Sequence, residues 1–247
     1  MELLALALAP GIAIMWFIYS ADKFEKEPLR ALLFSFLLGI LAIVPVIVLE
    51  LGGTAVLGEL LPKEGWVYYG LLSFIVVAFT EELAKWSMVR WYAYRRPFFN
   101  EPFDGIVYGV MVAMGFATIE NIFYVFQYGW QTGLLRMVLS VPAHATFGVL
   151  MGYYFGLARF VGKTKEWGLK IRGLLLATFF HGLYDLFLLV QQDSSITSHI
   201  STGLLFGSAV LSYLVAVKLS WQAIKLHQQI SREGVHTKQT TPFPDRV

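Results

Sequence analysis

The sequence is short of charged residues and contains no cysteine. Without cysteine the chain has no disulfide, no thiolate nucleophile and no cysteine-based metal site. Charged residues make up 15% of the chain, whereas a soluble domain has about 25%. No polar stretch is long enough to form a separate soluble domain. The remaining composition, 57% hydrophobic with a mean hydropathy of +0.61, is typical of a protein with several membrane spans.

A membrane helix needs about 20 consecutive apolar residues, and seven windows of the chain reach roughly this length. We therefore predict an all-α, polytopic membrane helix bundle of about seven transmembrane helices in residues 1–222, followed by a polar cytoplasmic tail in residues 223–247. No basic segment precedes the first window, so we interpret it as a span and not as a cleaved signal peptide. The windows are residues 1–20, 29–50, 67–90, 104–127, 137–158, 170–190 and 201–222.

The lysines and arginines predict the orientation of the bundle. If the N-terminus lies outside, 16 of the 19 lysines and arginines fall on the cytoplasmic side, as the positive-inside rule requires. Only Lys63 and Arg136 then lie outside, while Lys85 lies within the membrane. An even number of spans would destroy this distribution. We therefore predict an external N-terminus and a cytoplasmic C-terminus.

The third window carries Glu81, Glu82 and Lys85 within little more than one helical turn. Each charge at hydrocarbon depth costs roughly 2.5–3.5 kcal/mol on insertion scales, so such residues indicate a function. Glu81 and Lys85 are four residues apart and share a helix face. Glu82 is turned away by about 100°, so we expect it to lie outside that pair. Glu82 is then freer to react, unless the cavity lies on the face that Glu81 shares with Lys85, and either glutamate can be the base. The alternative is a buried ion pair that only fixes helix packing.

Polar residues also interrupt the next three windows: Glu120 and Asn121, then His144, then His181 and Asp185. Taken alone, His144 is typical of a packing residue with a satisfied hydrogen bond. Acids, an amide and imidazoles on four consecutive helices predict one shared polar cavity, because each group needs a partner away from lipid. Counted at 1.5 Å per residue, the glutamates of the third window lie deeper than the other polar groups, unless that helix begins later than its window.

These residue types suit hydrolysis. A glutamate can take a proton from water, and imidazole or amide N–H groups can donate to a developing oxyanion. The same residues can bind a divalent metal. Two alternatives remain open: the acids and histidines relay protons in a proton-coupled transporter or channel, or the cavity belongs to a non-catalytic scaffold. The absence of an evident two-fold internal repeat argues against a transporter. The candidate metal ligands are Glu81, Glu82, Glu120, His144 and His181.

Five features occur in order along the chain: the loop Asp22-Lys23-Phe24-Glu25-Lys26-Glu27-Pro28, Glu81-Glu82-xx-Lys85, Phe116-xxx-Glu120-Asn121, His144, and His181-xxx-Asp185. This series resembles the motifs of the PrsW family of intramembrane proteases, which is related to the type II CAAX-prenyl endopeptidase and bacteriocin-processing superfamily. The resemblance covers roughly residues 1–220. Glu120 stands where the CAAX branch has a histidine, and Lys85 stands in place of that branch's arginine, one residue earlier. Both differences disfavour cleavage of prenylated peptides.

The resemblance implies a multi-pass protease of the bacterial cytoplasmic membrane. Its expected substrate is a membrane-anchored protein, typically an anti-sigma factor, cut near the outer face as the first step of regulated intramembrane proteolysis. A divalent metal such as zinc is a possible cofactor; we expect the lipid bilayer as a partner and no nucleic acid. Carried onto this sequence, Glu81 and Glu82 would activate water and Glu120, His144, His181 and Asp185 would complete the water or metal site, supported by Lys85, Asn121 and Phe116.

Overall fold

The computed structural model describes residues 2–23 and 25–240, with side chains up to residue 233, and the regular elements in this part of the chain are all helical. Seven helical segments within it are long and apolar enough to cross a membrane, which confirms the predicted number of spans. They are Glu2–Ala21, Leu29–Leu60, Gly65–Arg95, Pro102–Tyr128, Trp130–Arg159, Lys163–Gln192 and Thr202–Glu233.

Some of these segments consist of several elements. The third span joins α3, the π-helix η1, α4 and a short 3-10 turn, η2, whereas the fifth joins α6 and α7. The sixth span ends in the 3-10 turn η3, and α9 follows it. The bounds are α1 Glu2–Ala21, α2 Leu29–Leu60, α3 Gly65–Leu71, η1 Leu72–Phe79, α4 Thr80–Trp91, η2 Ala93–Arg95, α5 Pro102–Tyr128, α6 Trp130–Val138, α7 Ser140–Arg159, α8 Lys163–Leu189, η3 Val190–Gln192, α9 Ser194–Thr197 and α10 Thr202–Thr240.

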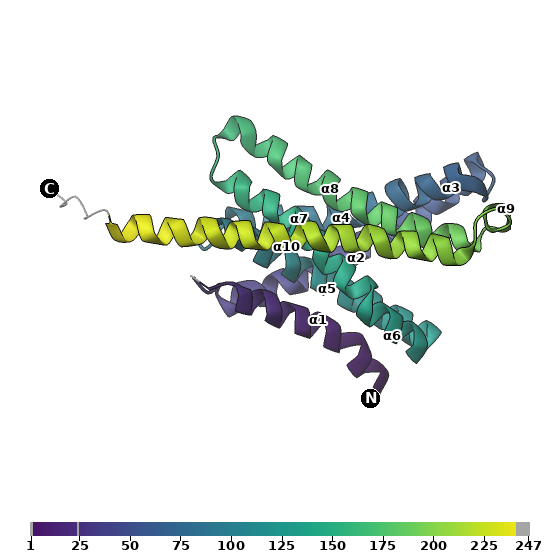
Figure 1. Cartoon of the computed structure of the whole chain (residues 1–247), viewed down its shortest axis with the longest axis horizontal. Coiled ribbons are helices and arrows are strands. Elements are labelled where there is room, and N and C mark those ends of the chain that lie inside the picture. Colours follow the sequence, from purple (N-terminus) through teal and green to yellow (C-terminus); the bar gives the residue numbers. More distant parts are fainter. Residues whose placement is uncertain (1, 24, 241–247) are drawn as a thin grey trace.

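The centre of the bundle is α5. Of its most apolar stretch 78% is buried, against 22% for those of α1 and α10. The helices α1, α2 and α7 pack against α5, and Figure 1 shows α10 running across the bundle, with α3 and α9 at one end. Leu33, Leu41 and Leu51 of α2 point outward and are 59–69% exposed. An apolar outer surface of this kind is what helices in contact with lipid require.

A glycine seam joins α5 to α7. Gly105 and Gly109 of α5 face Gly148 and Gly152 of α7, and a Cβ built on Gly152 would lie 2.2 Å from the Gly105 carbonyl oxygen. Small residues of this kind let two backbones approach closely. The seam places the polar residues of α5 and α7 on neighbouring helices at short range.

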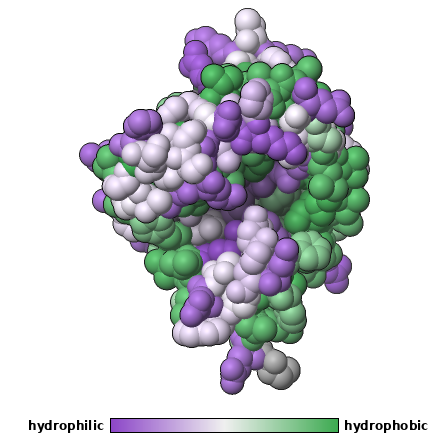
Figure 2. Space-filling view, turned by 90° about the vertical axis from the view of Figure 1, so that its right-hand side faces the viewer, coloured by the Kyte–Doolittle hydropathy of each residue, from purple (hydrophilic) through white to green (hydrophobic). Residues whose placement is uncertain are grey.

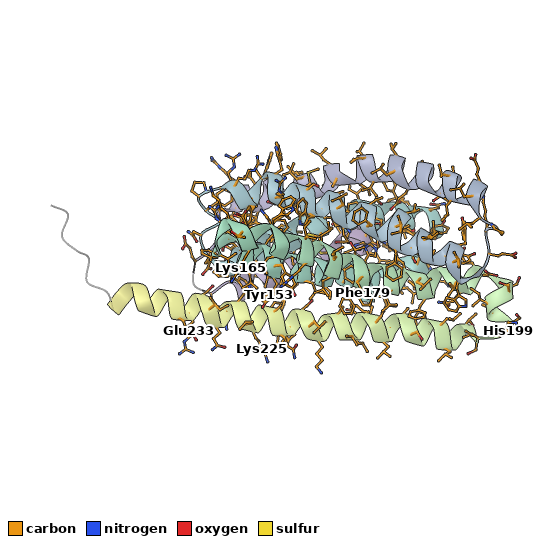
Figure 3. The ribbon with its side chains drawn as sticks, turned by 90° about the horizontal axis from the view of Figure 1, so that it is seen from above. Tyr153, Lys165, Phe179, His199, Lys225 and Glu233 are labelled. Atoms are coloured by element: carbon orange, nitrogen blue, oxygen red, sulfur yellow. The ribbon has the colours of Figure 1, made fainter. Side chains whose placement is uncertain are left out.

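Two segments are longer than the predicted windows. The helix α2 continues beyond residue 50 to Leu60, since Gly53 packs against Val76 of η1 instead of ending the helix. The helix α10 continues through residues 223–240 of the predicted tail, and residues 241–247 lie outside the described part of the chain. Figure 3 shows α10 along one side of the bundle, with His199 at the end opposite Lys165.

Candidate functional site

A π-helix precedes the acidic pair of the third span. The π-helix η1 ends at Phe79, and Glu81 and Glu82 lie in the first turn of α4. A π turn holds more residues than an α turn, and such turns occur frequently at functional sites. The predicted difference in depth is not found: Glu81 Oε2 lies 4.0 Å from His144 Nδ1, and Glu82 Oε1 lies 2.9 Å from His181 Nδ1. A segment that advances less per residue than an α-helix explains why counting along the sequence placed the pair too deep.

Lys85 lies between both glutamates and a histidine. Its Nζ is 2.8 Å from Glu81 Oε2, 2.8 Å from Glu82 Oε1 and 3.2 Å from His144 Nδ1. The ammonium also lies over the ring of Phe116, 4.2 Å from its centroid. The prediction that Glu82 lies outside the Lys85 pair is therefore wrong, because residues three and four apart are both neighbours on a helix surface.

His181 joins this group from α8. Its Nδ1 is 2.9 Å from Glu82 Oε1, and its Nε2 is 3.2 Å from Asp185 Oδ2. The imidazole also stacks on Phe147, with ring centroids 5.0 Å apart. Carboxylates at both ring nitrogens and an aromatic face fix the orientation of the ring. His181 and Asp185 thus project from one face of α8, as their spacing predicts.

A second series of contacts connects His144 with α1. His144 Nε2 lies 2.8 Å from Glu120 Oε2, and Arg136 Nη2 lies 3.0 Å from the same oxygen. Arg136 Nε donates to Asn121 Oδ1 over 2.9 Å, and Asn121 Nδ2 donates to the Ala7 carbonyl over 3.0 Å. The short helix α6 turns Arg136 inward, so this arginine belongs to the site and is not simply an external charge.

Four residues of the group can hold a metal ion. Glu81, Glu82, His144 and His181 each offer one ligand atom, and these atoms lie within 4.8 Å of one another. Oε2 of Glu82 is buried and has no hydrogen-bond partner among the described residues, so an oxygen is available for coordination. Imidazoles combined with a carboxylate are a donor set that catalytic zinc sites use. Glu120 is not part of this set, because His144 and an arginine hold its carboxylate.

The group borders a cavity of about 450 Å³ between α2, α4, α5, α7 and α8. Tyr124, Leu189 and Gln192 border the cavity toward the end that carries α3, α6 and α9, and Figure 2 shows a hollow with hydrophilic residues around it at that end. Glu81 lines the cavity, whereas Glu82 is fully buried and does not. Glu81 is therefore the carboxylate of the pair that faces the cavity.

The structure brings the predicted site residues together, and it adds two that the sequence analysis missed. Arg136, which contacts Glu120, and Glu50 of α2, which lines the cavity, both lie near the end of a predicted span, where charged residues are common, so no sequence signal distinguishes them. The predicted residues in mutual contact are Glu81, Glu82, Glu120, His144, His181 and Asp185, with Lys85, Asn121 and Phe116 beside them.

Comparisons with known proteins show the family to which the chain is similar. Residues 27–219 match the sequence model of a family described as PrsW family intramembrane metalloprotease. The chain is 38% identical to Protease PrsW of Geobacillus kaustophilus (strain HTA426) over 192 residues, which cover 77% of this chain and 81% of that protein. It is 34% identical to Protease PrsW of Bacillus subtilis (strain 168) over 189 residues, or 75% of this chain and 82% of that protein. No solved structure matches the chain.

Proposed function

Because the chain belongs to the PrsW family of intramembrane metalloproteases, we propose that it hydrolyses a peptide bond of a membrane-anchored protein in the cavity beside Glu81. Membership of this family makes the chain a peptidase and a multi-pass membrane protein. The observation that carries the proposal is a buried set of two glutamates and two histidines at the wall of that cavity. A proton-coupled transporter is not favoured, because the matched relatives are proteases.

We assign the metal site to Glu82, His144 and His181, with zinc as the proposed ion. Two histidines and one glutamate are the ligand set of several zinc peptidases. A metal bound there would lower the pKa of a water molecule and polarise the substrate carbonyl. Each histidine has a carboxylate on its other side, Glu120 on His144 and Asp185 on His181. Such outer carboxylates fix the tautomer and direction of a metal-binding imidazole.

Glu81 is the proposed general base. Its carboxylate faces the cavity, and Lys85 holds it in place over 2.8 Å. Glu81 accepts a proton from water while the water oxygen bonds to the carbonyl carbon. As the bond between carbon and nitrogen breaks, Glu81 returns that proton to the leaving amine. The products are a carboxyl terminus and an amino terminus, and no other reactant is needed.

The position of the cavity supports a cut near the outer face. The cavity reaches toward the end of the bundle that carries α9, and the basic loop around Lys165 lies at the other end (Figure 3). With the basic loops in the cytoplasm, the N-terminus and the cavity opening lie outside. An anti-sigma factor with one membrane span is a substrate of suitable form, and this cut would be the first in its regulated proteolysis.

The test is a cleavage assay with purified protein in liposomes and a tagged, single-span anti-sigma factor. We expect wild type to release a fragment cut near the outer face and a chelator to stop the reaction. Glu82→Gln and His181→Ala should each reduce the rate at equal expression and equal helical content. The site assignment is overturned if both variants cleave as fast as wild type.

A further inference from the structure

Glu50 is an acid of the cavity wall for which the proposed mechanism has no use. It lies on α2, and its neighbours on the same wall are Ile43, Val46 and Ile47. Its Oε1 is buried and has no hydrogen-bond partner among the described residues. A polar group of this kind normally has a partner, since leaving it unpaired costs about 1–3 kcal/mol and more when it is charged.

The other acids of the cavity wall each have a positive or imidazole partner. Glu81 contacts Lys85, Glu120 contacts Arg136, and Asp185 contacts His181. No lysine, arginine or histidine of the described chain forms a salt bridge with the Glu50 carboxylate. Its charged neighbours at longer range are the acids Glu81 and Glu120 and, with smaller effects of opposite sign, His181 and Lys85. The α2 wall therefore presents a carboxyl group without a cationic partner to whatever enters the cavity.

Building on the proposed function, we propose that Glu50 determines substrate specificity by receiving a lysine or arginine side chain close to the scissile bond. An apolar stem and a charged head fit this wall, since the stem can lie along Ile43 and Ile47 while the head reaches Glu50. Basic residues commonly flank membrane spans at the interface, which is where a single-span substrate would present its cleavage site. A charged head that donates a hydrogen bond would supply the partner that the buried Glu50 oxygen lacks.

The test is a set of matched peptides in which one residue at a time around the cut is lysine, norleucine or glutamate. A hydrogen bond to a charged group is worth about 1.5–3 kcal/mol, so we expect wild type to prefer lysine over norleucine by about 10- to 100-fold in kcat/KM at one position. Glu50→Gln should abolish this preference and cleave the norleucine peptide within about twofold of wild type. Glu50→Lys should prefer the glutamate peptide. Equal losses on all three peptides in Glu50→Gln would overturn the proposal.

Binding to the inactive Glu81→Gln protein separates this proposal from the proposed function. The lysine peptide should bind about 10- to 100-fold more tightly than the norleucine peptide, and an added Glu50→Gln change should remove the difference. Equal affinities in the Glu81→Gln protein overturn the role of Glu50. If wild type cleaves none of the peptides while lysine is still preferred in binding, the proposed function fails and the role of Glu50 stands.

Discussion

The central helix α5 carries two acids, the buried Asp104 in its first turn and the partly buried Glu120 about 24 Å farther along. Around Glu120 four acids each contact a lysine, arginine or histidine; we call this group, which excludes Glu50, the cavity cluster. Around Asp104 the acids lie near one another and receive hydrogen bonds; we call this group the loop cluster. The cavity cluster comprises Glu81, Glu82, Lys85, Glu120, Arg136, His144, His181 and Asp185, and the loop cluster comprises Asp22, Glu27, Glu101, Asp104 and Tyr108.

The loop cluster has few positive charges. The Tyr108 hydroxyl donates to the Glu27 carboxylate, and the backbone N–H of Asn100 donates to Asp104 Oδ2 over 2.7 Å. Lys26, the nearest cation of Asp22, directs its Nζ to backbone carbonyls instead. Burial therefore raises the pKa of Asp22 to about 6 and that of Glu27 to about 7. The acids of the cavity cluster thus have positive or imidazole partners, whereas the acids of the loop cluster have few, and burial there favours the protonated carboxyl group.

The difference between the two clusters is tested most directly by making the same substitution, glutamate to glutamine, in both. Glu81→Gln removes the proposed base, and general-base catalysis contributes about 10²- to 10⁴-fold, so we expect kcat to fall by that factor. Glu27→Gln keeps a neutral side chain where the native carboxyl already tends to be protonated, so kcat should stay within about twofold. Initial rates on the single-span substrate measure both. Equal losses would contradict the division between the clusters.

Removing the central cation of the cavity cluster should have the largest effect on stability. Lys85→Met leaves Glu81 and Glu82 buried without their ammonium partner, and breaking a buried pair costs about 3–5 kcal/mol. In the loop cluster Lys26→Met removes hydrogen bonds to two carbonyls and a cation–π contact with Tyr19 at a partly exposed site, so it should cost about 1 kcal/mol. Thermal unfolding in detergent, followed by circular dichroism, compares the two.

A double variant tests the reason for that difference. In Lys85→Met with Glu82→Gln, one of the unpaired charges is gone, so the combined cost should be smaller than the sum of the single costs. If the two costs add, or if Lys26→Met is as harmful as Lys85→Met, then pairing of charge does not explain the stability of the cavity cluster.

The sequence predicted the cavity cluster far better than the loop cluster, for a physical reason. Glu81, Glu120 and His181 stand in apolar windows, where a polar group is costly and therefore informative. Asp22 and Glu27 stand in a polar loop, where acids are common, and only folding against α5 buries them. The contacts between site residues were also harder to predict than the residues themselves. Lys85 contacts both Glu81 and Glu82, and this depends on side-chain packing, which the spacing in the sequence does not determine.

A substitution of Arg136, at the edge of the cavity cluster, should have a smaller effect on catalysis than the substitution of Glu81. Its planar guanidinium contacts Glu120 and Asn121 together, and a lysine cannot reproduce such a fork. Arg136→Lys should lower kcat/KM by about 10-fold, since outer partners of metal-binding residues contribute about 10- to 100-fold. Arg159→Lys, at the other end of the fifth span, is the matched control and should leave the rate within about twofold. If Arg136→Lys cleaves as fast as wild type, Arg136 has no role in the function of the cavity cluster.

The smallest predicted effect, on stability, concerns Asp22. Because its pKa is raised in the folded protein, the folded state keeps a proton that the unfolded chain has lost, and stability falls as the pH rises from about 4 to about 7. Above that range the buried carboxylate is charged without a close partner. Asp22→Asn should therefore stabilise the protein by about 1 kcal/mol at pH 8 and should have little effect at pH 4. The value at pH 8 is smaller than the ~3 kcal/mol that a shift of two pKa units represents.

Asp193 provides the control of opposite sign. Hydrogen bonds from the backbone N–H of Gly65 and from Ser195 lower the pKa of Asp193, so its carboxylate contributes stability above its unfolded pKa and loses that contribution in acid. Asp193→Asn should thus destabilise the protein at pH 8 and still do so at pH 4, which lies above its unfolded pKa, whereas Asp22→Asn should stabilise at pH 8 and have little effect at pH 4. Thermal unfolding of both variants at the two pH values measures the signs. If Asp22→Asn also destabilises at pH 8, the loop cluster holds its charges as the cavity cluster does, and the contrast between the two ends of α5 disappears.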